Sequence, residues 1–415
     1  MIFRCAQCDS VHDGAGFKTA CPACSGLIDV EYDLASATLH DSPNPYHRFF
    51  DLLPVSDRDL LATNSRYTPC VRAESLGSAI GLPWLYLKDE TVQPTGTTKD
   101  RMATVALAHL WESGVRAFCA ASTGNSSTAY AHGIRRIPGL RMFVFTPEEA
   151  MSHVDLGDSP RVISIGLRDA TYAAAYRAAA EFANKQGLVP ECGFFNPGAR
   201  EGLKLAFFEA VEQIPRPIDW YAQAVSSGMG VVGTLKGAAE LQAMGEIRRV
   251  PRALCVQQDS CAPLVNADRE KSESLEAHHM VARPTGIAAQ LLNGDPSHSY
   301  PHLRNAVRKS KGGFASVTEA DIRKARQMAN ECEGIDPCNS AATALAGVIK
   351  QARRGLLDPN ATVLVNITGS ERAAGHAGQR SHWMVQSNDG WQLEDPDVTV
   401  PWRGEERLNP VVDGS

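Results

Sequence analysis

The sequence lacks an excess of positive charge. Its 41 lysine and arginine residues are outnumbered by 47 aspartate and glutamate residues, so the formal net charge is −6 at pH 7. Proteins that bind nucleic acid over a broad surface carry the opposite balance, because positive side chains must meet the phosphates. We therefore expect no nucleic-acid partner.

Long apolar segments are also missing. No uninterrupted apolar run reaches the roughly 18 residues that a membrane-spanning helix needs, so no membrane partner is expected. The first residues, MIFRCAQC, contain no basic stretch followed by an apolar one, which is the pattern of a secretory signal. The sequence thus predicts a cytoplasmic protein.

An even, regularly spaced set of cysteines is absent as well. The eleven cysteines are an odd number scattered through the chain, which argues against a disulfide framework. Cys5 and Cys8 form one C-x-x-C pair, and Cys21 and Cys24 form another after twelve residues. This spacing predicts a zinc ribbon in residues 1–34, because tetrahedral zinc is held by four thiolates from two tight turns. The alternative is a ribbon fold that carries no metal.

From about residue 76, helical and strand-like patterns alternate, which predicts an α/β fold with parallel strands and crossover helices. Strands are expected at 82–90, 116–122, 141–147, 161–166, 220–228, 252–258 and 361–369. Helices are expected at 99–114, 125–136, 170–187, 230–245, 319–334 and 339–355. No internal repeat or low-complexity segment interrupts this order.

One lysine stands at the start of a predicted helix, in the segment KDETVQPTGTTKDR (88–101). Lys99 follows a Pro-Thr-Gly turn and two threonines, so it would feel the positive end of the helix dipole. That field disfavours the ammonium form and makes the amine a better nucleophile toward an aldehyde such as pyridoxal phosphate. The ordinary alternative is a solvated surface charge.

Three further polar motifs follow predicted strands. The first, STGNSSTAYAHG (122–133), could bind an anion at a helix start, or Ser122, Thr123 or Asn125 could simply cap that helix. The last, VLVNITGSERA (363–373), ends a buried strand in Thr368, whose hydroxyl could bond a cofactor ring nitrogen. Ligands bind at the carboxyl ends of strands in open α/β sheets, so these motifs predict one common cleft.

The remaining motif lies between these two in the chain and is glycine-rich, SSGMGVVGTLKG (226–237). Its backbone could cradle a phosphate. A dinucleotide-binding oxidoreductase is the rival interpretation. That function needs an acidic residue about 20 positions on, at the end of the next strand. Glu246 has that spacing but precedes the strand, which disfavours a dinucleotide.

These motifs, together with FFNPGAREGLK (194–204), occur in the order seen in threonine synthase and its relatives, which the chain resembles. Those proteins are fold type II pyridoxal-phosphate enzymes, with the fold of the tryptophan synthase β-subunit. The resemblance extends from residue 1 to about 375. It implies a two-lobed α/β enzyme with mainly parallel sheets, preceded by the zinc-ribbon-like segment.

The resemblance also implies roles for individual residues. Lys99 corresponds to the lysine that holds pyridoxal phosphate and serves in catalysis, and Asn125 to the asparagine that bonds the cofactor's 3′-oxygen. Thr368 corresponds to the hydroxyl near the pyridine nitrogen, an arrangement that favours elimination and replacement over transamination. The phosphate loop corresponds to Gly228, Met229, Gly230, Val231 and Val232, and the substrate-carboxylate loop to Ser122, Thr123 and Asn125.

The chain departs from the threonine synthase pattern at two places. Thr98 precedes the lysine where those enzymes commonly have phenylalanine, and the phosphate loop lacks their Gly-Asn-x-Gly-Asn form. The C-terminal half looks closer to cysteate synthase, which replaces the phosphate of O-phosphoserine with sulfite. The implied reaction is a β- or γ-replacement or elimination on an O-phospho or similarly activated amino acid. Arg101, Arg200 and Lys204 could hold an anionic leaving group, or each could equally be a surface charge. Arg200 is preferred because it lies in the family-like segment.

The resemblance divides the chain beyond residue 34 into three parts. A large cofactor-binding domain would comprise 35–110 and 215–385, and a small α/β domain 111–214. Residues 386–415 would form a C-terminal tail. We expect a homodimer, the common case for soluble enzymes. The competing hypothesis is a non-catalytic zinc-ribbon protein whose α/β body binds a ligand without turnover.

Overall fold

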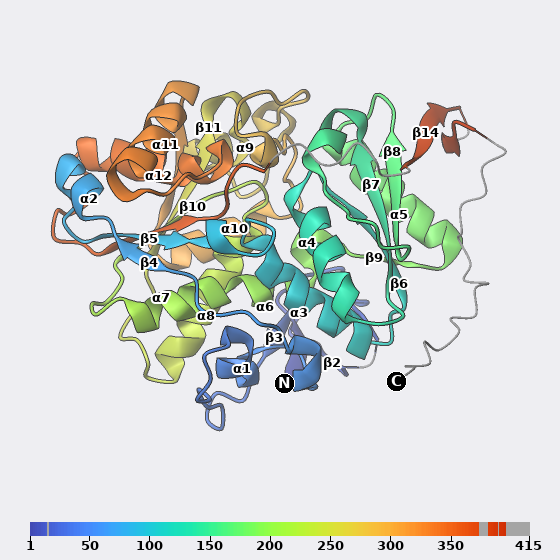
Figure 1. Cartoon of the computed structure of the whole chain (residues 1–415), viewed down its shortest axis with the longest axis horizontal. Coiled ribbons are helices and arrows are strands. Elements are labelled where there is room, and N and C mark those ends of the chain that lie inside the picture. Colours follow the sequence, from blue (N-terminus) through green and yellow to red (C-terminus); the bar gives the residue numbers. More distant parts are fainter. Residues whose placement is uncertain (15, 373–380, 389, 396–415) are drawn as a thin grey trace, which may run out of the picture.

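The computed structural model describes residues 1–14, 16–372, 381–388 and 390–395 and contains three β-sheets. Figure 1 shows the larger α/β lobe on the left, the smaller on the right and the N-terminal segment below their junction. This arrangement confirms the expected two-lobed α/β architecture with mainly parallel sheets.

The N-terminal segment is a small antiparallel sheet of β1 (Ile2–Cys5), β2 (Val11–His12) and β3 (Ile28–Glu31), in the order β2-β1-β3. It packs directly against the body of the protein. The ring of Phe3 stacks on His109, with 5.5 Å between ring centroids. The segment is therefore held to the lobes by an apolar contact as well as by the chain.

The larger sheet has the order β12-β11-β10-β13-β5-β4. Its strands are β4 (Cys70–Arg72), β5 (Leu85–Asp89), β10 (Trp220–Ala224), β11 (Arg252–Gln258), β12 (Gly313–Val317) and β13 (Val363–Ile367). Each pair is parallel except β4 with β5. The strands are nearly continuous apolar runs because helices cover both faces.

Two hydrophobic clusters cover the faces of this sheet. Alternation along β13 sends Leu364 to one cluster and its neighbours Val363 and Val365 to the other. The first cluster is closed by α7 (Leu205–Gln213), α8 (Met229–Ala243) and α10 (Tyr300–Lys309). The second is closed by α2 (Glu74–Ile80), α11 (Glu319–Glu333) and α12 (Asn339–Arg353). The shorter helices are α1 (Pro45–Arg48), α6 (Pro197–Leu203) and α9 (Pro263–Arg269).

The smaller sheet has the order β15-β14-β8-β7-β6-β9. Its strands are β6 (Ala117–Ala121), β7 (Arg141–Pro147), β8 (Val162–Leu167), β9 (Val189–Pro190), β14 (Ser381–Ser387) and β15 (Gly390–Leu393). Helix α5 (Tyr172–Gln186) packs on one face, and α3 (Lys99–Glu112) and α4 (Asn125–Gly133) pack on the other. Helix α3 also contributes Val105 and Ala108 to the core of the larger lobe, so it joins the two lobes.

Two predicted domain limits are wrong. Residues 381–385 were assigned to the large domain and 386 onward to a tail, but β14 pairs parallel with β8 and extends the smaller sheet. The small domain was also predicted to run to residue 214. Helix α7 instead places Phe207 and Phe208 in the core of the larger lobe, where Phe207 packs against Tyr221. Packing partners distant in sequence determined both outcomes.

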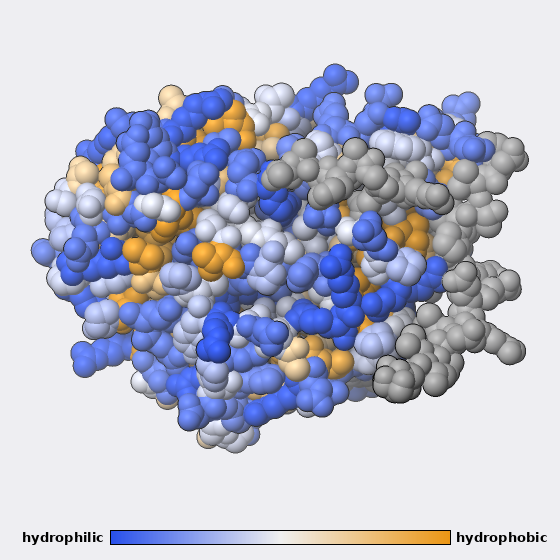
Figure 2. All heavy atoms as spheres, viewed as in Figure 1, coloured by the Kyte–Doolittle hydropathy of each residue, from blue (hydrophilic) through white to orange (hydrophobic). Residues whose placement is uncertain are grey.

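Figure 2 shows a largely hydrophilic face with small, separated hydrophobic patches. Within the part of the chain that the structure describes, no helix is both long and apolar enough to span a bilayer.

Candidate active site

A cavity of about 440 Å³ opens between the two lobes. Its walls come from the start of α3, the β6–α4 junction, α5, the segment after β9, the β10–α8 junction and the segment before α10. The polar and charged residues that line it include Lys99, Ser122, Thr123, Asn125, Arg177, Glu191, Ser226, Ser227, Gln290, Asn293, Asp295 and His298. The carboxyl ends of β6 and β10 thus meet at one cleft with the start of α3, as predicted, whereas no residue of the last motif, 363–373, lines it.

Lys99 is the first residue of α3, at the end of a turn that is fixed to the end of β13. The backbone N–H of Thr98 donates to the carbonyl of Thr368 at 2.9 Å, and that of Ser370 donates to the carbonyl of Gly96 at 2.9 Å. These bonds bring the first and last motifs together, although they are far apart in the chain. Thr368 itself does not line the cavity; its carbonyl holds the loop that presents the lysine.

The electrostatic environment of Lys99 favours the neutral amine. Burial lowers the pKa of Lys99 to about 8, although the carboxylate of Glu191 acts in the opposite direction. An amine with this pKa has a far larger neutral fraction near neutral pH than an ordinary lysine, and the neutral form is the one that acts as a nucleophile or base.

The small-lobe wall begins at the loop before α4. The hydroxyl of Ser122 accepts the backbone N–H groups of Gly124 at 3.1 Å and Ser127 at 3.2 Å, so this side chain caps the helix. Gly124 has φ of 150°, and a Cβ there would lie 3.1 Å from the carbonyl of His153. Only glycine fits this turn, which leaves Thr123 and Asn125 lining the cavity.

The glycine-rich segment meets the cavity at the start of α8. Met229 and the preceding Ser226 and Ser227 line it, whereas Gly228, Gly230, Val231 and Val232 do not. Gly228 has φ of 82° and precedes the helix, and Val231 lies in the hydrophobic core. The first N–H groups of a helix have no intrahelical acceptor, so the backbone here can still bind an anion. The two serines were not predicted as site residues, although they stand in the same motif.

Glu191 is the functional candidate that the sequence analysis missed. Its side chain lines the cavity, and three donors fix it: the Tyr130 hydroxyl at 2.6 Å, the Asn196 amide at 3.2 Å and the Gly193 N–H at 2.8 Å. It follows the two-residue strand β9, which is too short to give a periodic signal. A carboxylate held in this way places a negative charge close to Lys99.

The three basic residues predicted to hold an anionic leaving group lie elsewhere. Arg200 is buried, donates to the carbonyl of Phe194 at 2.7 Å and to that of Ile28, and so ties the N-terminal sheet to the body. Lys204 is buried in ion pairs with carboxylates, and Arg101 likewise. None of the three lines the cavity, so the preference for Arg200 is corrected: its guanidinium serves two backbone carbonyls and pairs with Asp29 at 3.6 Å.

The four N-terminal cysteines converge as the C-x-x-C pairs predict. The Cys5 and Cys24 sulfurs are 3.5 Å apart and those of Cys8 and Cys21 are 3.7 Å apart; all four lie within 4.8 Å of one another. Tetrahedral zinc with thiolate ligands places its sulfurs about 3.8 Å apart, which follows from a bond of about 2.3 Å. The residues present therefore fit a metal ion.

We predict that the protein purified without chelator contains about one zinc per chain. Cys8→Ser should abolish the metal content, because three thiolates no longer complete the tetrahedron, and lower the melting temperature. Cys332→Ser, on α11 outside the ribbon, is the matched control and should keep the zinc. Metal analysis that finds no zinc, together with slow hydrogen exchange in β1 and β3, would mean that the ribbon folds without metal.

Comparison with known proteins places the chain in a family. A family model described as "Pyridoxal-phosphate dependent enzyme" matches residues 61–369. Threonine synthase of Methanocaldococcus jannaschii is 27% identical over 381 residues, which cover 89% of this chain and 92% of that protein. Cysteate synthase of Methanospirillum hungatei is 27% identical over 373 residues, which cover 86% and 87%. These relatives confirm the resemblance to that branch of the family.

Solved structures agree on the fold. The processed form of threonine deaminase isoform 2 from Solanum lycopersicum matches with a TM-score of 0.61 and 19% identity, over 88% of this chain and 94% of that one. Maize serine racemase gives the same TM-score and identity over 77% and 92%. The chain thus has the fold type II architecture that its motifs predicted.

Proposed function

The chain belongs to the family of pyridoxal-phosphate dependent enzymes, and from that premise we propose that it catalyses a β- or γ-replacement or elimination on an activated amino acid such as an O-phospho amino acid. The relatives named threonine synthase and cysteate synthase support this class of reaction. The observation that carries the proposal is a lysine with a pKa of about 8 in the inter-lobe cavity.

In this proposal Lys99 would hold pyridoxal phosphate through its aldehyde, and the free amine of Lys99 would serve as the base that removes the substrate α-proton. The bound cofactor supplies the electron sink for that step. Asn125 would bond the cofactor's 3′-oxygen, and the start of α8 would bind its phosphate. The resemblance assigns Thr368 to the ring nitrogen, although Thr368 does not line the cavity. Thr123 and the backbone at the start of α4 hold the substrate carboxylate, because unpaired N–H groups at a helix start bind anions.

The charged residues that line the cavity indicate where an anionic leaving group would bind. Among the described residues that line the cavity there is one arginine, Arg177, which lies exposed at the rim on α5. Glu191 is buried on the same wall. A phosphate leaving group is therefore best placed toward Arg177, where the guanidinium can bind it, and away from the Glu191 carboxylate.

A panel of amino acids tests the reaction. The purified enzyme would be mixed with O-phosphohomoserine, O-phosphoserine, O-acetylserine or threonine, with and without sulfite, while free phosphate and the cofactor spectrum are followed. Release of phosphate, acetate or ammonia supports the proposal and names the leaving group. A protein that binds pyridoxal phosphate but turns over none of them would favour the non-catalytic ligand-binding alternative.

Glu191→Gln should move the pH at which the lysine takes up the cofactor. The carboxylate stabilises the ammonium form of Lys99, so its removal should lower the pKa of the lysine below about 8. The rate at which the apoprotein couples to pyridoxal phosphate, followed from about pH 6 to about pH 9.5, should then rise at a lower pH than in the wild type.

The matched control is Asp295→Asn, which removes an exposed carboxylate from another wall of the same cavity. Its pH midpoint should stay close to that of the wild type, because solvent screens exposed charges. If Glu191→Gln leaves the midpoint unchanged, or if Asp295→Asn shifts it equally, Glu191 does not set the charge state of the lysine.

A further inference from the structure

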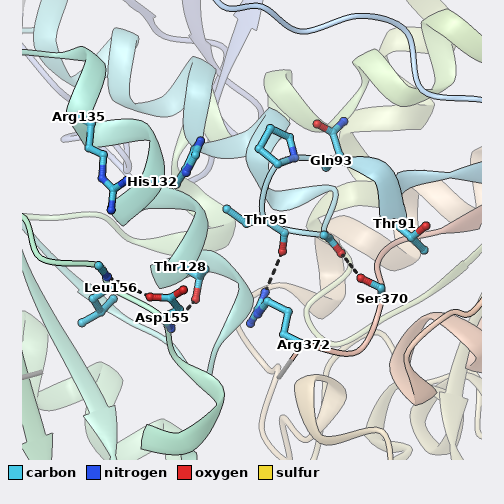
Figure 3. Close-up of a pocket in the computed structure, with 13 residues that line it drawn as sticks. Thr91, Gln93, Thr95, Thr128, His132, Arg135, Asp155, Leu156, Ser370 and Arg372 are labelled. Carbon is cyan, nitrogen blue, oxygen red and sulfur yellow. Dashed lines mark hydrogen bonds between the residues drawn. The ribbon is translucent and has the colours of Figure 1, made fainter. Parts of the chain in front are cut away.

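A second inter-lobe cavity, of about 430 Å³, lies next to the segment that carries Lys99 (Figure 3). Its lining residues are Thr91, Gln93, Pro94, Thr95, Gly96, Thr128, His132, Arg135, Asp155, Leu156, Gly157, Ser370 and Arg372. None of these residues lines the cavity that contains Lys99. Neither the proposed reaction nor the cofactor accounts for it.

Arg372 crosses between the lobes at this cavity. Its guanidinium donates to the carbonyl of Thr95 at 3.4 Å, in the larger lobe, and to that of His153 at 3.0 Å, in the smaller lobe. Arg372 is half-buried, and this burial lowers the pKa of its guanidinium. Among the described residues no carboxylate forms an ion pair with Arg372, although Asp100, Asp155 and Glu371 lie close enough to raise its pKa against the effect of burial. These two bonds use two of the five N–H groups of Arg372 and leave three for other acceptors.

A second arginine and a histidine line the same space. Figure 3 shows Arg135 and Arg372 on different walls of the cavity, with His132 on α4 in the same view. The acidic lining residue is Asp155, whose carboxylate accepts the N–H of Gly157 at 3.1 Å. Two arginines and one aspartate give the lining a net charge of +1 before any protonation of His132.

We propose that this second cavity binds a small metabolite that carries a phosphate or carboxylate group. The planar guanidinium of arginine matches both oxyanions in a bidentate geometry, and two arginines can bind one anion from different sides. The hydroxyls of Thr91 and Ser370 donate to Asp89 and to the carbonyl of Gly96, and their oxygens can still accept from donors on the rest of the ligand. A volume of about 430 Å³ exceeds what a bare phosphate fills and falls in the range of small-metabolite sites.

An anion in this cavity would influence the catalytic one, because two structural elements serve both. The segment before α3 places Thr95 and Gly96 at the second cavity and Lys99 at the first. Helix α4 places Asn125 at the first cavity and His132, near its other end, at the second. A ligand that holds Arg135 of the smaller lobe to Arg372 favours one relative position of the lobes, which makes it an effector of the cleft.

The experiment measures binding to the holoenzyme, in which pyridoxal phosphate already fills the cofactor's own phosphate site. Inorganic phosphate and citrate are titrated separately by calorimetry, and the cofactor absorbance is followed in parallel. We expect saturable binding of at least one anion, and the tighter one identifies the ligand as phosphate- or carboxylate-bearing. Arg135→Ala should weaken that binding by about tenfold or more, because a charge-assisted contact is lost.

The matched control is Arg177→Ala, which removes an exposed arginine at the first cavity. Both substitutions are at exposed positions, so both variants should fold, which circular dichroism checks. Arg135→Ala should remove a saturable anion site that Arg177→Ala retains, even where Arg177→Ala weakens separate phosphate binding in the first cavity, and this pattern supports the second cavity. Absence of saturable binding up to about 10 mM, or binding that depends on Arg177 alone, would overturn the proposal. Binding that leaves the cofactor absorbance unchanged would refute the coupling between the cavities.

Discussion

Lys99→Ala should fold normally yet lose the visible absorbance of the lysine-bound cofactor and reduce turnover by about 10³-fold or more. The proposed lysine has two tasks, to hold the aldehyde of the cofactor and to remove the α-proton, and alanine can do neither. The fold should survive because the turn that presents the lysine is held by backbone bonds, such as that from Thr98 to Thr368, and these do not involve the lysine side chain. Steady-state turnover, cofactor absorbance and melting temperature are measured on one sample.

Thr98→Val is the matched control, one residue earlier in the same turn. The hydroxyl of Thr98 is buried without a hydrogen-bond partner among the described residues, so an isosteric methyl should be neutral or slightly stabilising. This variant should keep the absorbance and most of the turnover. Comparable activity in Lys99→Ala and Thr98→Val would show that another group carries the chemistry.

Local sequence signals were enough to predict most of the two large sheets. Strands β7 and β13, of seven and five residues, are nearly continuous apolar runs, a pattern typical of parallel strands buried on both faces. Helix α12 begins directly after Cys338 and ends at Arg353, within the predicted limits of 339–355. The polar motifs that follow these strands then predicted the position of the cleft, because parallel strands present their carboxyl ends at one edge of the sheet.

The structure departs from the predictions where long-range contacts decide. Strand β14, SHWMVQS, contains an apolar run of only three residues, Trp383 to Val385, and it is defined by pairing with β8, a strand far earlier in the chain. Glu191 is placed by Tyr130, 61 positions earlier in the chain. Arg200 has the sequence context of an anion-binding residue, but its partner carbonyl at Ile28 is 172 positions away. The cytoplasmic location and the homodimer stay predictions.

Arg101 was predicted as a candidate for holding a leaving group, and its contacts indicate a different task. Its guanidinium donates to Glu90 at 2.7 Å and to Glu209 at 2.5 Å, and all three side chains are buried. Lys88 donates to the same Glu209 at 2.7 Å, so two buried cations balance two buried anions. Burial raises the pKa of Glu90, but the opposing effect of its cationic partners, Arg101 above all, outweighs burial and brings the pKa down to about 2. The network therefore anchors the start of α3 two residues beyond Lys99.

Arg101→Leu should destabilise the protein by about 3 to 5 kcal/mol at neutral pH, because two buried carboxylates then share one cation. In the wild type the depressed pKa of Glu90 contributes stability above its unfolded value of 4.5, and this is lost as pH falls toward 2. In the variant the largest remaining influence on Glu90 is burial, which raises its pKa. The loss of stability caused by the unpaired carboxylate is therefore greatest at high pH, and it becomes smaller as the carboxyl protonates. The difference in melting temperature between the two proteins should therefore shrink as pH is lowered from about 7 to about 5.

A compensating substitution separates this structural role from a role in substrate binding. Arg101→Leu with Glu90→Gln leaves the Lys88–Glu209 pair balanced, so the double variant should recover part of the lost stability, although the hydrogen bonds of the guanidinium are not replaced. A leaving-group ligand would behave differently: its loss would raise KM for phosphorylated substrates at unchanged melting temperature. Unchanged stability in Arg101→Leu at neutral pH would therefore contradict the anchor. Restored stability in the double variant would show that the arginine's partner is the buried carboxylate, because no substrate is present when the melting temperature is measured.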